Sequence, residues 1–389
     1  MSQINLVEKP RIKTLDSLRG LAALTVVFTH IAGVSANEKI IHLTPLYILK
    51  SGHEAVIFFF LLSGYVLVYQ YAANPDYTYG EFLLQRICRI YVPYIVAMLF
   101  TVILFLLCKP HHLGTAWVHS MWTTPLSFNV IAKHVILVGN FGTSSFDPVI
   151  WSLVHEMRIA IIFPLLLLIL KCKPINVLAI SLTVAIIALI GIALNFEQAF
   201  GYYNTYSFTA YYLYIFIVGG LIAKKRTVLI ARYKRLTTNR KVLFLIIAIL
   251  MYNYANLGIY IFSITKHAPI VNDTIFMAVG DFLTVVASCY FIIASVSVSN
   301  NNVLTNRLFT FFGKISYSLY LVHLPVLSFL YFTLYNKIPT AVILSLGFVA
   351  SLIVAAIFNK CVEQPSVRIF KKGFFSKFYS RKTSSFRNH

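Results

Sequence analysis

Long runs of apolar residues, separated by short polar segments, follow one another along nearly the whole chain. Each run is about 17 residues or longer, enough for a helix to cross a hydrocarbon core of roughly 30 Å. A transmembrane barrel would instead show alternating segments of about ten residues, and the sequence does not have them. We therefore predict an all-α, polytopic membrane helix bundle of about ten transmembrane helices. The predicted helices cover Leu15–Val34, Ala55–Tyr71, Ile90–Cys108, Val149–Leu170, Ile175–Leu194, Tyr206–Ile222, Val242–Tyr260, Thr274–Val298, Phe309–Leu334 and Thr340–Phe358.

The composition supports a membrane protein. Apolar residues make up 59% of the 389 residues and charged residues 12%, and the mean hydropathy is +0.78. A soluble domain of this length would need far more polar surface. We expect a multi-pass protein of the bacterial inner membrane.

The positions of Lys and Arg predict the orientation. With the N-terminus inside and an even number of helices, both termini are cytoplasmic, and most of the 33 Lys and Arg residues fall on cytoplasmic segments. The densest of these are Lys224–Lys241 and the stretch after Lys360. The net charge of +21 therefore reflects topology and attraction to anionic lipids, and we predict no nucleic-acid partner.

One transmembrane domain is expected over residues 1–370, followed by a basic cytoplasmic tail at 371–389. The long outer loop Lys109–Pro148 should pack over the outer mouth and contribute to an acceptor site. No internal repeat is visible, which disfavours an inverted-repeat transporter. The basic stretch Lys9–Lys13 before an apolar run resembles a signal peptide, but we expect no cleavage because cleavage would remove Arg19 and His30.

Ionisable residues inside membrane helices are costly and by default mark a functional site. Arg19 and His30 share one face of the first helix, about 16 Å apart along its axis. Arg19 should lie at the cytoplasmic edge and His30 in the outer half of the bilayer. The pair suits an extended ligand that is anionic at its cytoplasmic end. The alternatives are an arginine that reaches the interface and a histidine paired across helices.

The fourth predicted helix carries Trp151, Ser152 and Glu156 in its first turns. Glu156 should lie within about a turn of the depth of His30, where a carboxylate can orient an imidazole and raise its basicity. The alternative is that Glu156 pairs with Arg158 or His155 for structure alone.

Further polar residues fall near the same site. Arg86 and Arg89 stand three apart before the third helix and should project to one side. Arginine binds phosphate in a bidentate manner, which suits a nucleotide donor, and the alternative is that the two arginines only mark the cytoplasmic side. The step Ser63-Gly64 allows close helix approach or passage of a narrow ligand arm. The ninth helix carries a polar stripe, and the isolated acid Asp281 has no predicted role. The stripe comprises Ser316, Tyr317, Tyr320 and His323.

These residues occur in motifs that resemble those of the acyltransferase-3 family of integral membrane acyltransferases, in the same order and over nearly the whole chain. The matching motifs are Leu15-Asp16-Ser17-Leu18-Arg19-Gly20 leading to His30, Phe59-Phe60-Leu61-Leu62-Ser63-Gly64, Arg86-Ile87-Cys88-Arg89, Trp151-Ser152-Leu153-x-x-Glu156, Gly313-x-x-Ser316-Tyr317-x-x-Tyr320-Leu321-x-His323 and Glu363-Gln364-Pro365.

The resemblance implies transfer of an acyl group, usually acetyl, from cytoplasmic acyl-CoA to a hydroxyl of an extracytoplasmic glycan or glycolipid, such as O-antigen, lipopolysaccharide or exopolysaccharide. It implies a catalytic role for His30, and donor binding by Arg19, Arg86 and Arg89. We add Glu156 as the residue that orients His30. We expect acetyl-CoA as co-substrate and no metal. Substrate-binding or supporting roles are expected for Ser63, Trp151, Ser152, Tyr320 and His323.

Two departures from common family members stand out. His155 and Arg158 add charge near Glu156, and the tail is too short for the hydrolase-like module that some members carry. We predict direct transfer with His30 as general base, while a ping-pong route through an acyl-histidine stays open. The rival functions are a proton-coupled transporter or flippase of a glycan precursor, and a membrane scaffold.

Overall fold

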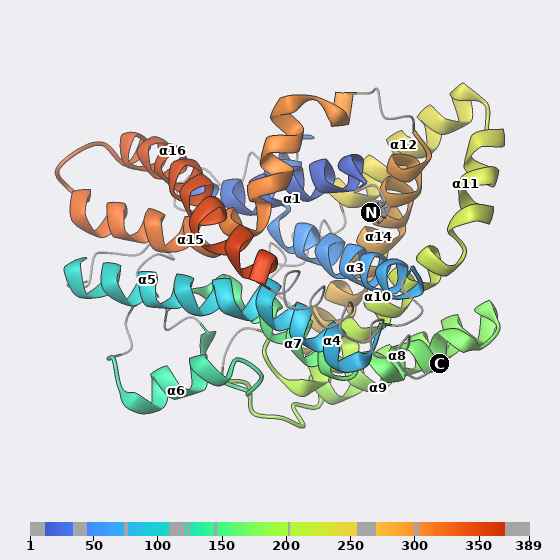
Figure 1. The fold of residues 1–389 in the computed structure, drawn as a ribbon, viewed down its shortest axis with the longest axis horizontal. Coiled ribbons are helices and arrows are strands. Elements are labelled where there is room, and N and C mark those ends of the chain that lie inside the picture. Colours follow the sequence, from blue (N-terminus) through green and yellow to red (C-terminus); the bar gives the residue numbers. More distant parts are fainter. Residues whose placement is uncertain are drawn as a thin grey trace, which may run out of the picture.

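The computed structural model describes residues 12–33, 45–73, 77–108, 121–122, 125–143, 146–200, 203–254, 270–298 and 303–369. Over these ranges the chain forms helices and turns without a strand. Long apolar helices pack side by side, and α1, α3, α5 and α15 run along the long axis of the molecule (Figure 1). The prediction of an all-α membrane bundle is confirmed.

Eight helices of the described residues are long and apolar enough to cross a membrane, and a bent pair adds a ninth. Two of the eight include a short π-helix, η2 or η7, in which the backbone hydrogen bonds span five residues instead of four. The eight are α1 (Lys13–Ala32), α3 (Gly52–Ala72), α4 (Tyr79–Arg86) with η2 (Ile87–Tyr91) and α5 (Val92–Cys108), α9 (Pro174–Ala193), α10 (Tyr206–Lys224), α14 (Ile270–Ser297), α15 (Arg307–Leu334), and α16 (Thr340–Phe358) with η7 (Asn359–Glu363).

The fourth predicted helix, Val149–Leu170, is not continuous. A short helix η5 (Pro148–Ile150) leads into α7 (Trp151–Ile161), and α8 (Phe163–Lys171) then leaves at 63°. Pro164 explains the break, because its ring crowds the preceding turn and it has no N–H to donate. The Tyr79 hydroxyl donates to the Ile161 carbonyl at the break, at 2.6 Å.

The cytoplasmic segments predicted to be basic are partly described. The stretch Lys224–Lys241 contains a helix, α11 (Arg226–Arg235), with no buried residue. The next helix, α12 (Thr238–Asn253), has 16 residues, and the end of the predicted span Val242–Tyr260 lies outside the described residues. The predicted tail, residues 371–389, lies outside them as well.

The described parts of the long outer loop pack against the bundle. It holds a helix, α6 (Phe128–Ile136), and Tyr94 of α5 donates its hydroxyl to the carbonyl of His134, at 2.9 Å. Trp122 stacks on Phe332 of α15, with ring centres 5.8 Å apart. Figure 1 shows α6 beside α5 at the left end of the molecule. Positions 109–120, 123–124 and 144–145 of this loop are outside the described residues.

Glycines set two close helix crossings that position the site. A Cβ on Gly20 of α1 would come within 2.5 Å of the backbone nitrogen of Gly313 on α15. A Cβ on Gly64 of α3 would come within 2.7 Å of the Cα of Phe216 on α10. Only residues without a side chain allow this approach. The Ser63-Gly64 step therefore serves close packing through Gly64, and it leaves Ser63 to face elsewhere.

Candidate active site

Five elements enclose a cavity of about 800 Å³, a volume that includes its open mouth. Its walls come from α1, α3, the α4–η2 junction, α7 and α15. Nine of its sixteen lining residues are charged or carry a hydroxyl group, and the other seven are apolar. The lining residues that the sequence had predicted for the site are Arg19, Ser63, Arg86, Arg89, Ser152, Glu156 and Tyr320.

The three predicted phosphate-binding arginines meet in this cavity. Arg86 is 4% exposed, and its Nε and Nη2 have no hydrogen-bond partner among the described residues. Its Nη1 lies 3.8 Å from Oε1 of Glu156, and the closest approach between Arg19 and Asp16 is 3.9 Å. Both distances exceed those of a charge-assisted hydrogen bond. The guanidinium groups therefore keep hydrogen-bonding capacity for an anion.

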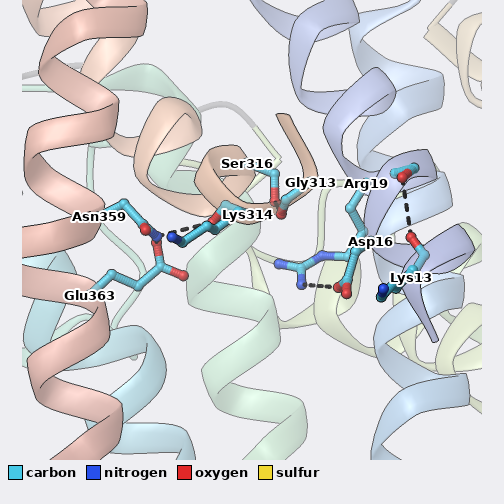
Figure 2. A network of polar contacts seen from close by, with 9 residues as sticks. Lys13, Asp16, Arg19, Gly313, Lys314, Ser316, Asn359 and Glu363 are labelled. Atoms are coloured by element: carbon cyan, nitrogen blue, oxygen red, sulfur yellow. Dashed lines mark hydrogen bonds and ion pairs between the residues drawn. The ribbon is translucent and has the colours of Figure 1, made fainter. Parts of the chain in front are cut away.

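Figure 2 shows the Arg19 guanidinium turned toward the Glu363 carboxylate, with Asp16 beside it. Glu363 ends the π-helix η7 and accepts hydrogen bonds from Ser318 at 2.6 Å and from Asn359 at 2.8 Å. In the sequence, Glu363 stands out only as part of a motif. Arg19 and Glu363 lie near each other in space but far apart in the chain, so no local pattern could reveal their proximity.

The second π-helix, η2, lies between Arg86 and the apolar helix α5. Tyr317 of α15 donates its hydroxyl to the carbonyl of Ile90 in this segment, at 2.8 Å. π-helical turns are rare and often mark functional sites. Here the turn carries Arg89, and both Arg86 and Arg89 line the cavity, as their spacing predicted.

Glu156 lies in the cavity wall but does not contact His30. Its Oε1 accepts a hydrogen bond from the Ser63 hydroxyl at 3.1 Å and faces Arg86. The contacts that the structure gives Glu156 are thus with Ser63 and with the buried Arg86. Its role in orienting His30 stays a prediction.

The alternative partners of Glu156, His155 and Arg158, are engaged elsewhere. His155 contacts Thr209 Oγ1 at 2.9 Å and the Tyr203 carbonyl at 2.6 Å. Arg158 is 6% exposed and donates five hydrogen bonds of 2.7–3.2 Å. The acceptors of Arg158 are the carbonyls of Val138, Gly139, Asn204 and Thr205 and the hydroxyl of Thr209. These two residues hold loops around the start of α7.

The start of α7 is also fixed from its own sequence. Asp147 is buried and accepts a hydrogen bond from the backbone N–H of Val149 at 3.3 Å, capping η5. Burial raises the pKa of this carboxyl well above its ordinary value. The cap places Ser152 and Glu156, one turn apart, on the cavity side of α7.

His30 contacts His323 outside the cavity lining. Nε2 of His323 lies 3.2 Å from Nδ1 of His30, and Nδ1 of His323 lies 2.9 Å from the Leu319 carbonyl. A carbonyl only accepts, so Nδ1 of His323 bears the proton and its Nε2 accepts in the neutral ring. His30 Nδ1, also 2.9 Å from the Val26 carbonyl, then carries the shared proton. The lone pair of neutral His30 is thereby on Nε2.

An aromatic layer, formed by Phe59, Phe60, Trp151 and Tyr320, lies at the outer part of the cavity, and three of its members, Phe59, Phe60 and Tyr320, line the cavity. Phe59 packs edge-on against Tyr320, and Phe60 packs edge-on against Trp151, with ring centres 6.2 and 6.0 Å apart. Tyr320 also neighbours His323 at 6.3 Å. Its hydroxyl donates to the Val149 carbonyl at 2.8 Å and lies 2.6 Å from Ser152 Oγ.

Helix geometry gives the depth of this layer. A Cβ on Gly52 of α3 would contact Thr29 of α1, so these positions are level. Val56, the outermost α3 residue that lines the cavity, is four positions further along α3, or about 6 Å deeper. The cavity thus ends roughly one helical turn short of His30, and Arg19 lies about 15 Å below Thr29.

A second titratable cluster lies at the same outer ends of the helices. His53 Nε2 of α3 is 2.7 Å from Oδ1 of Asp281 on α14, and Tyr211 of α10 donates its hydroxyl to Oδ2 at 3.0 Å. His53 packs parallel to Trp151 and at an angle to Tyr203. The sequence offered Asp281 as an unexplained acid and gave no sign of His53, because the two are 228 positions apart.

Comparison with known proteins identifies the family. Residues 12–360 match the acyltransferase-3 family, described as an acyltransferase domain. The chain belongs to this family. This result confirms the resemblance seen in the motifs and supports acyl transfer over transport. It also agrees with a multi-pass membrane protein.

A curated relative adds weaker support. The chain is 33% identical over 167 residues to "Acyltransferase MdmB" of Streptomyces mycarofaciens. The match covers 40% of this chain and 40% of the relative, so the aligned region spans well under half of either protein. No solved structure matched the chain.

Proposed function

We propose that this acyltransferase moves an acetyl group from cytoplasmic acetyl-CoA to a hydroxyl of an extracytoplasmic glycan, such as O-antigen or exopolysaccharide, in the bacterial inner membrane. The observation that carries the proposal is Arg86. It is a buried guanidinium with two nitrogens that no described residue bonds, in a cavity shared with Arg19 and Arg89. Burying such donors without partners costs several kcal/mol, and an anionic ligand would supply the partners.

Acetyl-CoA fits the layout of the cavity. Its phosphates would be held by Arg19, Arg86 and Arg89, whose planar groups suit phosphate oxygens. Its pantetheine arm would extend past Ser63 toward Tyr320, along the roughly 15 Å that α1 spans between Arg19 and Thr29. The thioester would then lie beneath the aromatic layer. Reaction requires a side-chain movement in that layer, because Tyr320 separates the cavity from His323 and His30.

His30 would act as the general base. Its Nε2 lone pair accepts the proton of the acceptor hydroxyl while the hydroxyl oxygen attacks the thioester carbon. The carbon–sulfur bond breaks, and the proton passes from His30 to the departing CoA thiolate. His323 supports this role by fixing the His30 tautomer through the contact between its Nε2 and His30 Nδ1. Glu156 would act by holding Arg86.

The experiment compares wild type with His30→Ala and His30→Gln in liposomes loaded with labelled acetyl-CoA, with glycan outside. We expect acetyl transfer to fall by about 10²–10⁴-fold, the usual contribution of general-base catalysis, while acetyl-CoA binding is retained. NMR of surface glycan from cells expressing each variant at matched levels gives the acetyl content and the position modified. Full transfer by either variant would refute the assignment of His30, and an acceptor that is never acetylated would refute the proposed function.

A further inference from the structure

The cluster of His53, Asp281 and Tyr211 is separate from the arginine cavity and from the His30–His323 pair. Asp281 is 1% exposed in the membrane helix α14, where an unpaired carboxylate is costly. Its two oxygens are bonded separately by His53 and by Tyr211. The carboxylate is thus satisfied within the protein and acts by fixing its neighbours.

The bond to Asp281 sets the chemistry that His53 presents. Because Asp281 accepts from Nε2, neutral His53 carries its proton there and its lone pair on Nδ1. No described residue bonds Nδ1, and the His53 side chain keeps 22% of its surface exposed. Nδ1 can therefore accept a hydrogen bond from a hydroxyl, or donate one when the ring is protonated.

Two aromatic rings, which also contact each other with ring centres 5.5 Å apart, lie beside this imidazole. Trp151 packs parallel to His53 with ring centres 6.3 Å apart, and Tyr203 lies 5.6 Å away. Flat aromatic surfaces beside one directional polar group are the components of a site that binds a molecule with apolar C–H faces and hydroxyl edges. A pyranose ring has this chemistry.

The location matches that of an acceptor. His53 follows Gly52, which abuts Thr29, the neighbour of His30. Trp151 belongs to the aromatic layer, so one of its neighbours, Phe60, lines the arginine cavity while another, His53, lies on the outer side. We propose that His53, held by Asp281 and with Trp151 and Tyr203 beside it, binds a pyranose ring of the glycan acceptor. That the bound sugar is the acceptor rests on the proposed function, whereas sugar binding itself can be tested alone.

The test is a fluorescence titration of the full chain with Trp117→Phe and Trp122→Phe, which leaves Trp151 as the one tryptophan of the three. The protein is held in an amine-oxide detergent that contains no sugar. The probes are the methyl pyranosides of glucose, galactose and rhamnose, with sorbitol as an open-chain polyol. We expect the pyranosides, and not sorbitol, to change the Trp151 emission.

Two variants and a control decide the outcome. His53→Gln keeps an N–H for Asp281 but removes the Nδ1 acceptor, and Asp281→Asn removes the charge that fixes it. Each should weaken pyranoside binding by about tenfold, the effect of one lost hydrogen bond to such a group. Asn140→Ala, which loses an outer-loop bond to Gln198, should bind as the parent does.

Unchanged binding in His53→Gln, or a parent protein that does not respond to any pyranoside, would overturn the inference. The same preparations are assayed for acetyl transfer from acetyl-CoA to these pyranosides, with separate KM values for donor and acceptor. A rise in acceptor KM alone in His53→Gln supports the acceptor role. Pyranoside binding that depends on His53, without any acetyl transfer, would leave the sugar site standing and remove the proposed function.

Discussion

Arg86 and Arg158 are both buried arginines in membrane helices, at 4% and 6% exposure, yet their surroundings differ. Arg158 donates five hydrogen bonds to carbonyls and a hydroxyl, and its guanidinium carbon lies 4.1 Å from the centre of the Tyr206 ring. Among the described residues, Arg86 has one carboxylate within 4 Å, at 3.8 Å, and two of its nitrogens have no hydrogen-bond partner. Burial alone therefore does not identify a binding residue. The count of satisfied donors separates the arginine that holds loops together from the one that can receive an anion.

The largest effect is expected from Arg158→Met. This change leaves four buried loop carbonyls without their donor, and removing one partner of a buried charged network typically costs about 3–5 kcal/mol. We expect a strongly lowered midpoint of thermal unfolding and little folded protein in membranes. Thermal unfolding in detergent, monitored by tyrosine and tryptophan emission, gives the midpoint. A midpoint equal to that of wild type would show that Arg158 is not structural.

A smaller and different effect is expected from Arg86→Met. Methionine fills similar space without buried donors, so we expect a change in stability of less than about 1 kcal/mol. Acetyl-CoA binding should weaken by about 10–100-fold, because a charge-assisted contact to phosphate is lost. Calorimetric titration with CoA gives the affinity, and the unfolding assay gives the stability.

Arg86→Met leaves Glu156 without its cationic neighbour, so the double variant Arg86→Met/Glu156→Gln is the control. It should restore any stability lost in the single variant without restoring CoA affinity. If Arg86→Met instead unfolds like Arg158→Met while its CoA affinity is unchanged, the contrast between the two arginines is wrong.

The smallest effect is expected from Glu156→Gln. Glutamine still accepts from Ser63 but removes the negative charge that faces Arg86. We expect CoA to bind about threefold to tenfold more tightly, the size of a partly screened charge interaction. The same calorimetric titration measures CoA affinity at two salt concentrations, and the gain in affinity should be smaller at the higher one. Weaker binding would indicate that Glu156 positions Arg86 more than it competes for it.

The sequence was sufficient for the membrane helices and for much of the cavity. Apolar runs locate the spans because a helix in lipid must satisfy its own backbone. The spacing of Arg86 and Arg89, and that of Ser152 and Glu156, correctly placed each pair on one wall. Such local spacings follow from helical periodicity alone.

Partners across helices could not be read in this way. His30 and His323 are 293 positions apart, and Arg86 and Glu156 come from different helices, so no local spacing pairs them. Pro164 is a local signal for the break between α7 and α8, because proline disrupts a helix at the preceding turn.

The aromatic layer also has an electrical consequence. An elementary charge that crosses a membrane potential of 100 mV releases about 2.3 kcal/mol. An open aqueous route through a protein would dissipate that energy. The arginine cavity penetrates much of the bundle, and the histidines lie about one turn beyond its end. Tyr320, at 5% exposure, lies both in the cavity wall and beside His323, with ring centres 6.3 Å apart. A packed ring at this position narrows the route between the polar chamber and the histidines, which limits the water that could carry protons across.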